Sequence, residues 1–538
     1  MAIVSNVLLY VAFAFLTGYA LLQLVPTNVR PELTFKKKYV YYLLLIIIVA
    51  GFLPILSISQ FISVQYEASF IKTLGNVMSS YNMGTSWLLM VLLTAFIALL
   101  VKIDIAYSRY IVFVIVLGLH FAAGWASHAV SLQSIQGLLA NSLHFIAVTA
   151  WIGTVLVIGF FSKEFSNWRG FVRWFSPLAI FAVGLLFLSG FLLMGMIVPE
   201  YVNSWALTYG QLLLLKHLLI IPILVFGFSH GFLLRRKIAK AESFSIRSFR
   251  LEGLIAIVIF VVTAIMTETT PPHEVARTLQ FVEPSALFLN FYHGQIIPFP
   301  GLGIVIGLPS ILFFIFSIAL VTMLLIFVFK QKRLFVASIV AVAFILSTYI
   351  ALMVSVVQND SNVDMTLYST VEEAVEAGVV EGENPTVLQT VTHLNQYKVV
   401  LYHVNNERLV TELLHIEENG DGYYRLPESM LTVGGVPISQ AEHKIRTFLI
   451  RDGYWLDDDY TYAYVTIGFI NEPEHVSNVQ IHYEGQLVET DMVNQSFINI
   501  SSSNEQWDEM HPIEFFNEQG EDIGGYMRGF MEEGAYCH

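Results

Sequence analysis

Ten apolar stretches constrain what this chain can fold into more than any other feature. They lie at approximately 3–25, 39–58, 84–103, 109–129, 139–161, 174–198, 210–234, 251–268, 307–329 and 334–357. A bilayer core is about 30 Å thick, and a helix needs roughly 20 apolar residues to cross it, because lipid offers unpaired backbone groups no partner. No stretch has the ten-residue alternation of a membrane β-barrel. The sequence therefore predicts a polytopic α-helical membrane protein with about ten transmembrane helices.

Charge divides the chain into two parts. Only 13% of its 538 residues are charged, whereas a soluble globular protein carries roughly 25%. Residues 1–357 hold 21 Lys and Arg against 10 Asp and Glu, and residues 358–538 hold 7 against 32. We therefore expect a basic-flanked membrane part followed by an acidic water-soluble part.

The loop charges predict the orientation. Alternate loops carry 18 basic residues, and the opposite set holds only Lys72 and Arg277. Basic loops face the cytoplasm, so ten helices would leave both termini extracytoplasmic. No basic residue precedes the first apolar run and no small-residue cleavage site follows it, so we expect an uncleaved helix rather than a signal peptide.

The acidic end has the pattern of a mixed α and β region. A helix start is indicated at Ser369–Glu373 by a capping residue followed by acids. Alternating segments predict strands at Tyr397–His403, Tyr462–Phe469, Val479–Tyr483 and Phe497–Ile500. We expect an extracytoplasmic α+β domain over 358–455 and a β-sandwich-like domain with a tail over 456–538, with a boundary near 452–460.

The acidic surface allows two interpretations. It could attract cations at the outer face, or it could simply be a solvated surface.

The only cysteine, Cys537, rules out a disulfide within the chain. Its neighbour His538 makes a soft Cu(I) or Zn contact possible, and a tail without function is the alternative.

Histidines inside the apolar spans are the first candidates for function, because ionisable groups in a membrane are costly. They are His120, His128, His144, His217 and His230, with Lys216 beside His217. The predicted topology places His128, His144, Lys216 and His217 in the outer half, where His128 and His144 could lie side by side. His273 and His293 follow in the outer loop.

Methionines show the same outer bias. Met194, Met196 and Met266 fall near the outer ends of their spans. Thioether and imidazole groups together suit Cu(I). The simpler alternatives are that methionine fills the core and that a lone membrane histidine bonds to a neighbouring carbonyl.

Several activities lack their signatures. The chain has no Gly-x-x-x-x-Gly-Lys-Ser/Thr and no Gly-x-Gly-x-x-Gly, so nucleotide-driven transport by this chain alone is not expected. It has no Cys-x-x-Cys-His haem attachment motif. We expect no nucleic-acid partner.

Four motifs resemble the copper resistance D (CopD) family of bacterial membrane proteins. They are Trp125-Ala126-Ser127-His128-Ala129, Leu143-His144 through Trp151-Ile152-Gly153, Tyr209-Gly210 through Lys216, and Phe249-Arg250-Leu251-Glu252. The resemblance covers roughly 1–275 (about eight helices), and residues 276–357 would add an outer loop and two more helices. Thr154 stands where the family often has a second Gly, and nothing resembles the copper-binding β-domain that some relatives carry.

The resemblance implies copper transport across the bacterial cytoplasmic membrane, usually uptake, by a protein that is not an enzyme. Under this hypothesis His128 and His144 form the outer site for copper, with Cu(I) favoured, and His217 and the outer methionines add ligands. Trp151 and Gly153 would support the site, and Lys216 would set its electrostatics. The acidic domain could capture metal or bind an extracytoplasmic copper chaperone or another protein.

Two other classes of function remain open. Paired intramembrane histidines, His120 with His217 or His144 with His217, could ligate haem b in a redox protein. Alternatively, the chain could be a membrane-anchored sensor or assembly factor that acts through its outer domain.

Overall fold

The computed structural model divides into two compact units. One unit, called here the helical unit, comprises residues 1–273 and 306–355, and the other, the strand unit, comprises 274–305 and 356–536. The structure describes residues 2–65, 69–103, 105, 107–163, 168–239, 247–279, 282–294, 299, 301–330, 334–359, 366–380, 382–393, 397–417, 420, 422–430, 436–437, 443–452, 461–470, 476–484, 486–505, 507 and 511–528.

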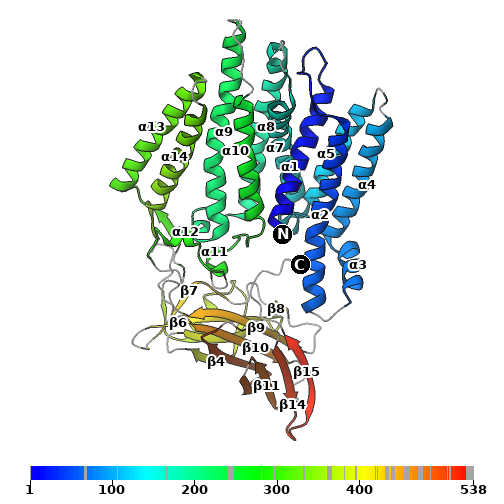
Figure 1. The fold of residues 1–538 in the computed structure, drawn as a ribbon. Helices are drawn as coiled ribbons and strands as arrows, with labels where there is room; N and C mark the ends of the chain where they lie inside the picture. Colours follow the sequence, from blue (N-terminus) through cyan, green and yellow to red (C-terminus); the bar gives the residue numbers. More distant parts are fainter. Residues whose placement is uncertain are drawn as a thin grey trace. The chain divides into compact units, whose positions relative to one another are not determined.

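Ten helices in the described residues are long and apolar enough to cross a membrane, which confirms the predicted fold class. They are α1 (Ala2–Leu24), α2 (Lys37–Gln65), α4 (Asn82–Ile103), α5 (Ser108–Trp125), α7 (Ser134–Phe161), α8 (Trp168–Ile197), α9 (Thr208–Ala239), α10 (Arg247–Met266), α13 (Leu308–Lys330) and α14 (Leu334–Met353). Short helices lie between them at α3 (Phe70–Ser80), α6 (His128–Leu132) and η1 (Asn203–Ala206). Within this unit, α13 and α14 stand at one edge and α4 at the other (Figure 1).

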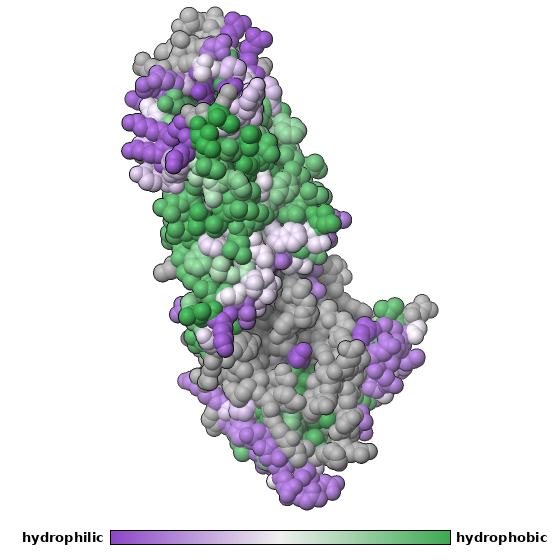
Figure 2. All heavy atoms as spheres, turned by 90° about the vertical axis from the view of Figure 1, so that its right-hand side faces the viewer, coloured by the Kyte–Doolittle hydropathy of each residue, from purple (hydrophilic) through white to green (hydrophobic). Residues whose placement is uncertain are grey.

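The surface of the helices is apolar because they face lipid rather than water. In the face drawn in Figure 2, hydrophobic residues form a continuous band over the helices, and hydrophilic residues gather at the bundle end opposite the N-terminus. Large exposed side chains such as Leu45, Leu92 and Phe181 belong to this lipid-facing surface. A helix that is apolar on all sides is a membrane span, not a surface helix of a soluble fold. The chain is therefore a multi-pass membrane protein.

Helix α7 crosses α1 at two glycines. A Cβ at Gly18 would collide with the backbone of Gly153, and a Cβ at Gly153 would collide with the carbonyl of Ala14. Small residues allow two helix backbones to approach this closely in a membrane. Gly153, which the sequence proposed as a supporting residue, is thus required by packing.

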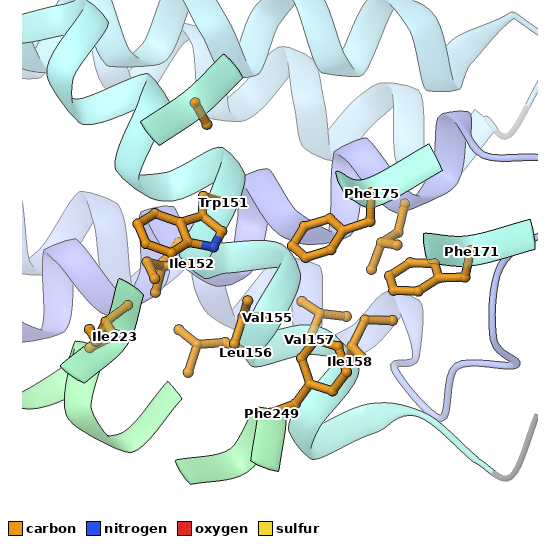
Figure 3. Close-up of a cluster of buried hydrophobic side chains, with 14 of the residues drawn as sticks. Trp151, Ile152, Val155, Leu156, Val157, Ile158, Phe171, Phe175, Ile223 and Phe249 are labelled. Atoms are coloured by element: carbon orange, nitrogen blue, oxygen red, sulfur yellow. The ribbon is translucent and has the colours of Figure 1, made fainter. Parts of the chain in front are cut away.

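The main core surrounds the inner half of α7. Val155, Leu156 and Ile158 are fully buried there, against side chains of α8, α9 and α10. Figure 3 shows Trp151 on one side of this cluster and the stacked pair Phe171 and Phe175 on the other. The predicted span near 139–161 is thus the central helix of the bundle.

The last two spans attach to α9. The Ser317 hydroxyl bonds to that of Ser347 at 2.9 Å, which joins α13 to α14. The Tyr349 hydroxyl on α14 donates to Gln211 on α9 at 2.5 Å. Hydrogen bonds between side chains on different helices replace the hydrophobic driving force that lipid removes.

The strand unit is a stack of antiparallel sheets with one helix packed on it. Its elements are α11 (Val275–Thr278), α12 (Ala286–Leu289), β1 (Leu302–Ile304), β2 (Val356–Gln358), β3 (Leu367–Tyr368), α15 (Val371–Glu376), β4 (Pro385–His393), β5 (Tyr397–Val404), β6 (Arg408–Ile416), β7 (Tyr423–Met430), β8 (Val436–Pro437), β9 (His443–Asp452), β10 (Thr461–Ile470), β11 (Asn478–Tyr483), β12 (Gln486–Asp491), β13 (Ser496–Ser503), β14 (His511–Phe516) and β15 (Asp522–Arg528). The sheet orders are β1-β2, β3-β7-β6-β5-β4 with β8 beside β6, β13-β10-β9, and β12-β11-β14-β15.

The side chains that alternate along each strand show which sheets pack on one another. Val400 and Tyr402 of β5 face the core that α15 covers, and Val399 and Leu401 face the sheet of β9, β10 and β13. The opposite face of that second sheet packs on the sheet of β11 and β14, through residues such as Tyr464. Because side chains alternate along a strand, β5 and β10 can each serve two cores. The four predicted strands correspond to β5, β10, β11 and β13.

The predicted helix start is a reciprocal cap. The Thr370 hydroxyl accepts from the Glu373 backbone N–H at 3.1 Å, and the Glu373 carboxylate accepts from the Ser369 N–H at 3.0 Å. The first bond satisfies one of the backbone donors that a helix start leaves unpaired, and the second holds the residue before the N-cap against the first turn.

A buried ion pair lies in the sheet next to α15. The fully buried carboxylate of Glu412 accepts from Arg425 at 2.7 Å and from the Tyr402 hydroxyl at 3.1 Å. Burial, and then the adjacent Glu412 carboxylate, raise the pKa of Tyr402. The pair that Arg408 of β6 forms with Glu383, which lies just before β4, is more exposed.

The proposed domain boundary near 452–460 falls mostly on residues outside those described. On either side of it, β9 and β10 pair antiparallel from Asp452–Thr461 to His443–Ile470. One core combines Val399 and Leu413 with Val465 and Ile498. The division into 358–455 and 456–538 remains a proposal.

Candidate metal-handling site

Two histidines meet at the end of the bundle that carries the chain's N-terminus. His128 is exposed and begins α6, just after the fourth span ends, and His273 follows the eighth span. Spans alternate in direction, so both residues lie on the same membrane face as the start of α1. Their ring centres are 6.5 Å apart, with an interplanar angle of 76°.

This separation suits one shared soft ion. A metal–nitrogen bond is about 2 Å long, so two imidazoles in line on one ion have ring centres roughly 6 Å apart. His128 and His273 come from segments 145 residues apart, and the fold brings them together. The sequence proposed each as a ligand without pairing them.

His144 lies deeper, between α7 and α8. Its Nδ1 is 3.2 Å from the Ser189 hydroxyl, which itself donates to the Leu185 carbonyl at 2.6 Å. Because the Ser189 hydrogen is used in that bond, Nδ1–H of His144 donates to Ser189 and Nε2 is left as the basic nitrogen. A second bond that fixes the ring in this way is the usual support of a ligating histidine.

His217 lies on α9. Its Nδ1 bonds to the Tyr201 hydroxyl at 2.8 Å. Tyr201 stands in the loop between α8 and α9, where burial raises the pKa of its hydroxyl to about 12. Lys216 and His217 both lie within electrostatic reach of His144, so the three residues form one inner group.

The structure thus places the candidate histidines at two depths in the bundle rather than at one. The Ala129 carbonyl lies against Gly137, and His144 is seven residues further along α7, about 10 Å deeper at 1.5 Å per residue. His128 contacts His273, whereas His144 is grouped with His217 and Lys216. Among the described residues, no three His, Cys, Asp or Glu side chains converge as a metal site.

The methionine candidates lie near this path. Met266 is buried with Val198 and Leu213 in a cluster against which Tyr201 packs. Met194 and Met196 are half-buried in the last turn of α8. No hydrogen bond or ring contact connects these thioethers to the histidines in the described part of the chain, so their part as ligands remains a proposal.

Trp151 lies two turns further along α7 from His144. It is buried, and its ring edge lies against α9 at Gly227, where a Cβ would be 3.4 Å from the indole and 3.6 Å from the Glu252 carboxylate. Trp151 is therefore a packing residue of the core, and its supporting role at a metal site remains a proposal.

Other candidates lie apart from these levels. His293 is exposed in the strand unit. The side chain of His230 and the residues Cys537 and His538 are outside those that the structure describes.

His120 is fully buried, and both of its ring nitrogens form hydrogen bonds. Its Nδ1 donates to the Val116 carbonyl at 2.7 Å, so its Nε2 accepts from the Thr149 hydroxyl at 2.8 Å. Phe13 and Phe145 pack on its ring with centres 4.9 Å away. Haem ligation by His120 would require breaking both hydrogen bonds and this packing.

Three polar side chains of the helical unit were not identified as important from the sequence. Ser189 and Tyr201 hold the inner histidines, and Gln211 bonds to the Trp205 carbonyl at 2.6 Å. The polar residues Gln211 and Ser189 inside apolar spans could have been noticed. Nothing in the local sequence marks Tyr201.

Comparisons with known proteins point to copper. Residues 169–266 match the family described as copper resistance protein D, and residues 1–138 match the copper resistance protein D-like N-terminal domain. The copper transport protein CutJ of Bacillus subtilis (strain 168) is 30% identical over 208 residues. That match spans 36% of this chain and 38% of the relative. No solved structure matches the chain significantly.

Proposed function

Since the chain belongs to the copper resistance protein D family through the two matched regions, we propose that it carries copper across the bacterial cytoplasmic membrane, inward as uptake. The observation that carries this proposal is the approach of His128 to His273, with ring centres 6.5 Å apart, at the end of the bundle that carries the N-terminus. Imidazole nitrogens and thioethers suit Cu(I).

Copper would be captured by the outer pair and pass to the inner group. His128 and His273 hold the ion first, and His144 takes it on through Nε2, with His217 beside it. Met266 lies close to this route, because Tyr201 contacts both its cluster and His217. Two weak binding sites suit transport better than one strong site, because an ion must leave as well as bind.

The loop charges support an outward-facing position for the His128–His273 pair. The basic loops at the other bundle end favour the cytoplasm, and we therefore propose that both termini and the acidic region lie outside. We propose that residues 358–538 capture metal or bind an extracytoplasmic partner such as a copper chaperone, because their acid excess attracts cations.

Copper retention tests the outer pair. Purified full-length chain would be loaded with Cu(I), desalted and analysed for metal and for a Soret band. We expect His128→Ala and His273→Ala each to lose the outer ion, and the double variant to lose no more than either single variant, because both hold one ion. His482→Ala, an exposed histidine of the strand unit, is the control.

Liposome flux completes the test. Proteoliposomes with the wild-type chain should take up Cu(I), and the double variant should not. A double variant that retains and transports copper like wild type would remove the basis of the proposal. A Soret band would favour the haem alternative instead.

A further inference from the structure

Helix α14 is connected by hydrogen bonds to the loop between α8 and α9. The Tyr349 hydroxyl on α14 donates to the side-chain oxygen of Gln211 on α9 at 2.5 Å. The amide nitrogen of Gln211 donates to the Trp205 carbonyl at 2.6 Å. Because a backbone carbonyl can only accept, these two bonds determine which end of the Gln211 amide faces which partner. Gln211 therefore joins α14 to the short helix η1 of that loop.

This connection is buried inside the helical unit. Gln211 is 1% exposed, Trp205 is 2% exposed and Tyr349 is 7% exposed. The amide nitrogen of Gln211 also lies 3.5 Å from the sulfur of Met353, so α14 contacts both ends of the amide. A buried polar group that loses its partner has no water to turn to. Removing the Tyr349 hydroxyl would therefore release the Gln211 amide from its present orientation.

The short helix η1 in turn holds Tyr201. The Ser204 hydroxyl donates to the Tyr201 carbonyl at 2.6 Å. Ser204 also lies so close to α9 that a Cβ at Gly210 would collide with its carbonyl. The rings of Trp205 and Tyr201 meet edge to face, with centres 5.7 Å apart and an interplanar angle of 80°. Both the backbone and the ring of Tyr201 are thus fixed, and its hydroxyl lies 2.8 Å from Nδ1 of His217.

We propose that Tyr349 and Gln211 are positioning residues for His217, which they hold in place through η1 and Tyr201. A ligating histidine needs a partner at the ring nitrogen that does not bind metal, and losing such a partner lowers metal affinity by about 10–100-fold. Tyr201 is that partner for His217. The tenth span therefore supports the inner group and is more than a membrane anchor. The meaning of this support for copper rests on the proposed function, whereas the position of the His217 ring does not.

Chemical labelling of His217 without metal tests the proposal. Diethyl pyrocarbonate acylates a free imidazole nitrogen, and mass spectrometry of the labelled full-length chain gives the rate at each histidine. Tyr201→Phe removes the direct partner and should give the largest increase in the rate at His217. Tyr349→Phe should increase that rate by about three-fold or more, as expected when one hydrogen bond that limits local opening is lost.

Two controls accompany these variants. Ser347→Ala removes another hydroxyl from α14, but that hydroxyl bonds to Ser317 on α13 and not to α9. Its labelling rate at His217 should match wild type. His293 is exposed in the strand unit, and its rate should be the same in every variant, which corrects for differences in reagent.

Three results would overturn the proposal. One is a Tyr349→Phe chain in which His217 is labelled at the wild-type rate. Another is a Tyr201→Phe chain with no increase, since Tyr201 would then not hold the ring. The third is an equal increase at the buried His120 in Tyr349→Phe, which would mean that the whole bundle loosens. A wild-type chain that retains no copper would contradict the proposed function alone, because the labelling is done without copper.

Discussion

Gly18 of α1 and Gly153 of α7 face each other so closely that neither position has room for a Cβ. The contact fixes how the first span lies against the central one. It also explains in physical terms why a glycine follows Trp151 by two residues in this helix.

Gly153→Leu should destabilise the helical unit. Forcing a side chain into a closed backbone contact costs about 1–3 kcal/mol or more, because the helices must separate. The thermal unfolding temperature in detergent should fall. Gly184→Leu on α8, where a Cβ would meet nothing within 4 Å, is the matched control and should leave it nearly unchanged; equal falls would contradict the packing argument.

Thr149→Val should destabilise the protein without altering copper retention. The change leaves the buried Nε2 of His120 with only the Thr17 hydroxyl, 3.4 Å away. A buried acceptor that loses its donor costs about 1–3 kcal/mol. Thr149→Ser keeps the hydroxyl and should behave like wild type. Copper loss in a stable Thr149→Val chain would show that His120 takes part in transport.

Arg425→Met should destabilise the strand unit far more than Arg408→Met. Glu412 is fully buried and would lose the cation that its carboxylate contacts, at a cost of about 3–5 kcal/mol. The Arg408–Glu383 pair is partly in water, where such pairs contribute about 0–1 kcal/mol. Hydrogen exchange of the β5 and β6 segments would measure both variants, and similar protection in the two would refute the difference.

Alkaline pH should weaken the strand unit through Tyr402. The folded state raises the pKa of this phenol above its ordinary value of about 10. The unfolded chain therefore loses its proton first, and the stabilisation present below pH 10 decreases as pH rises above it. Calorimetry of wild type and Tyr402→Phe from pH 8 to pH 11 would test this, with a shallower alkaline decline expected in the variant. Parallel curves would mean that Tyr402 is not responsible.

The sequence predicted what depends on local pattern. Span length and apolar composition found all ten long helices, because a bilayer imposes both on each span separately. The alternation of apolar and polar residues predicted β5 and β10. The capping residue at Thr370 and the acid at Glu373 predicted the start of α15. Each of these features is decided within about 20 consecutive residues.

What the sequence left open depends on long-range packing. The contact between His128 and His273 arises only when the segments that follow the fourth and eighth spans meet, which no short pattern encodes. The support of His217 by Tyr201 needs the loop after α8 to fold back. The sheet orders were equally out of reach, since β10 pairs with β13 and β11 with β14 across intervening strands.

The depth between the two histidine levels determines how copper movement would respond to voltage. About 10 Å separates His144 from the level of Ala129, roughly a third of a 30 Å bilayer core. A bare monovalent ion that crosses a third of the field gains about 0.8 kcal/mol per 100 mV. A copper ion that moves together with a counter-ion of equal charge would gain nothing. Current recorded during the first step of uptake would therefore distinguish a cation carrier from an electrically silent one.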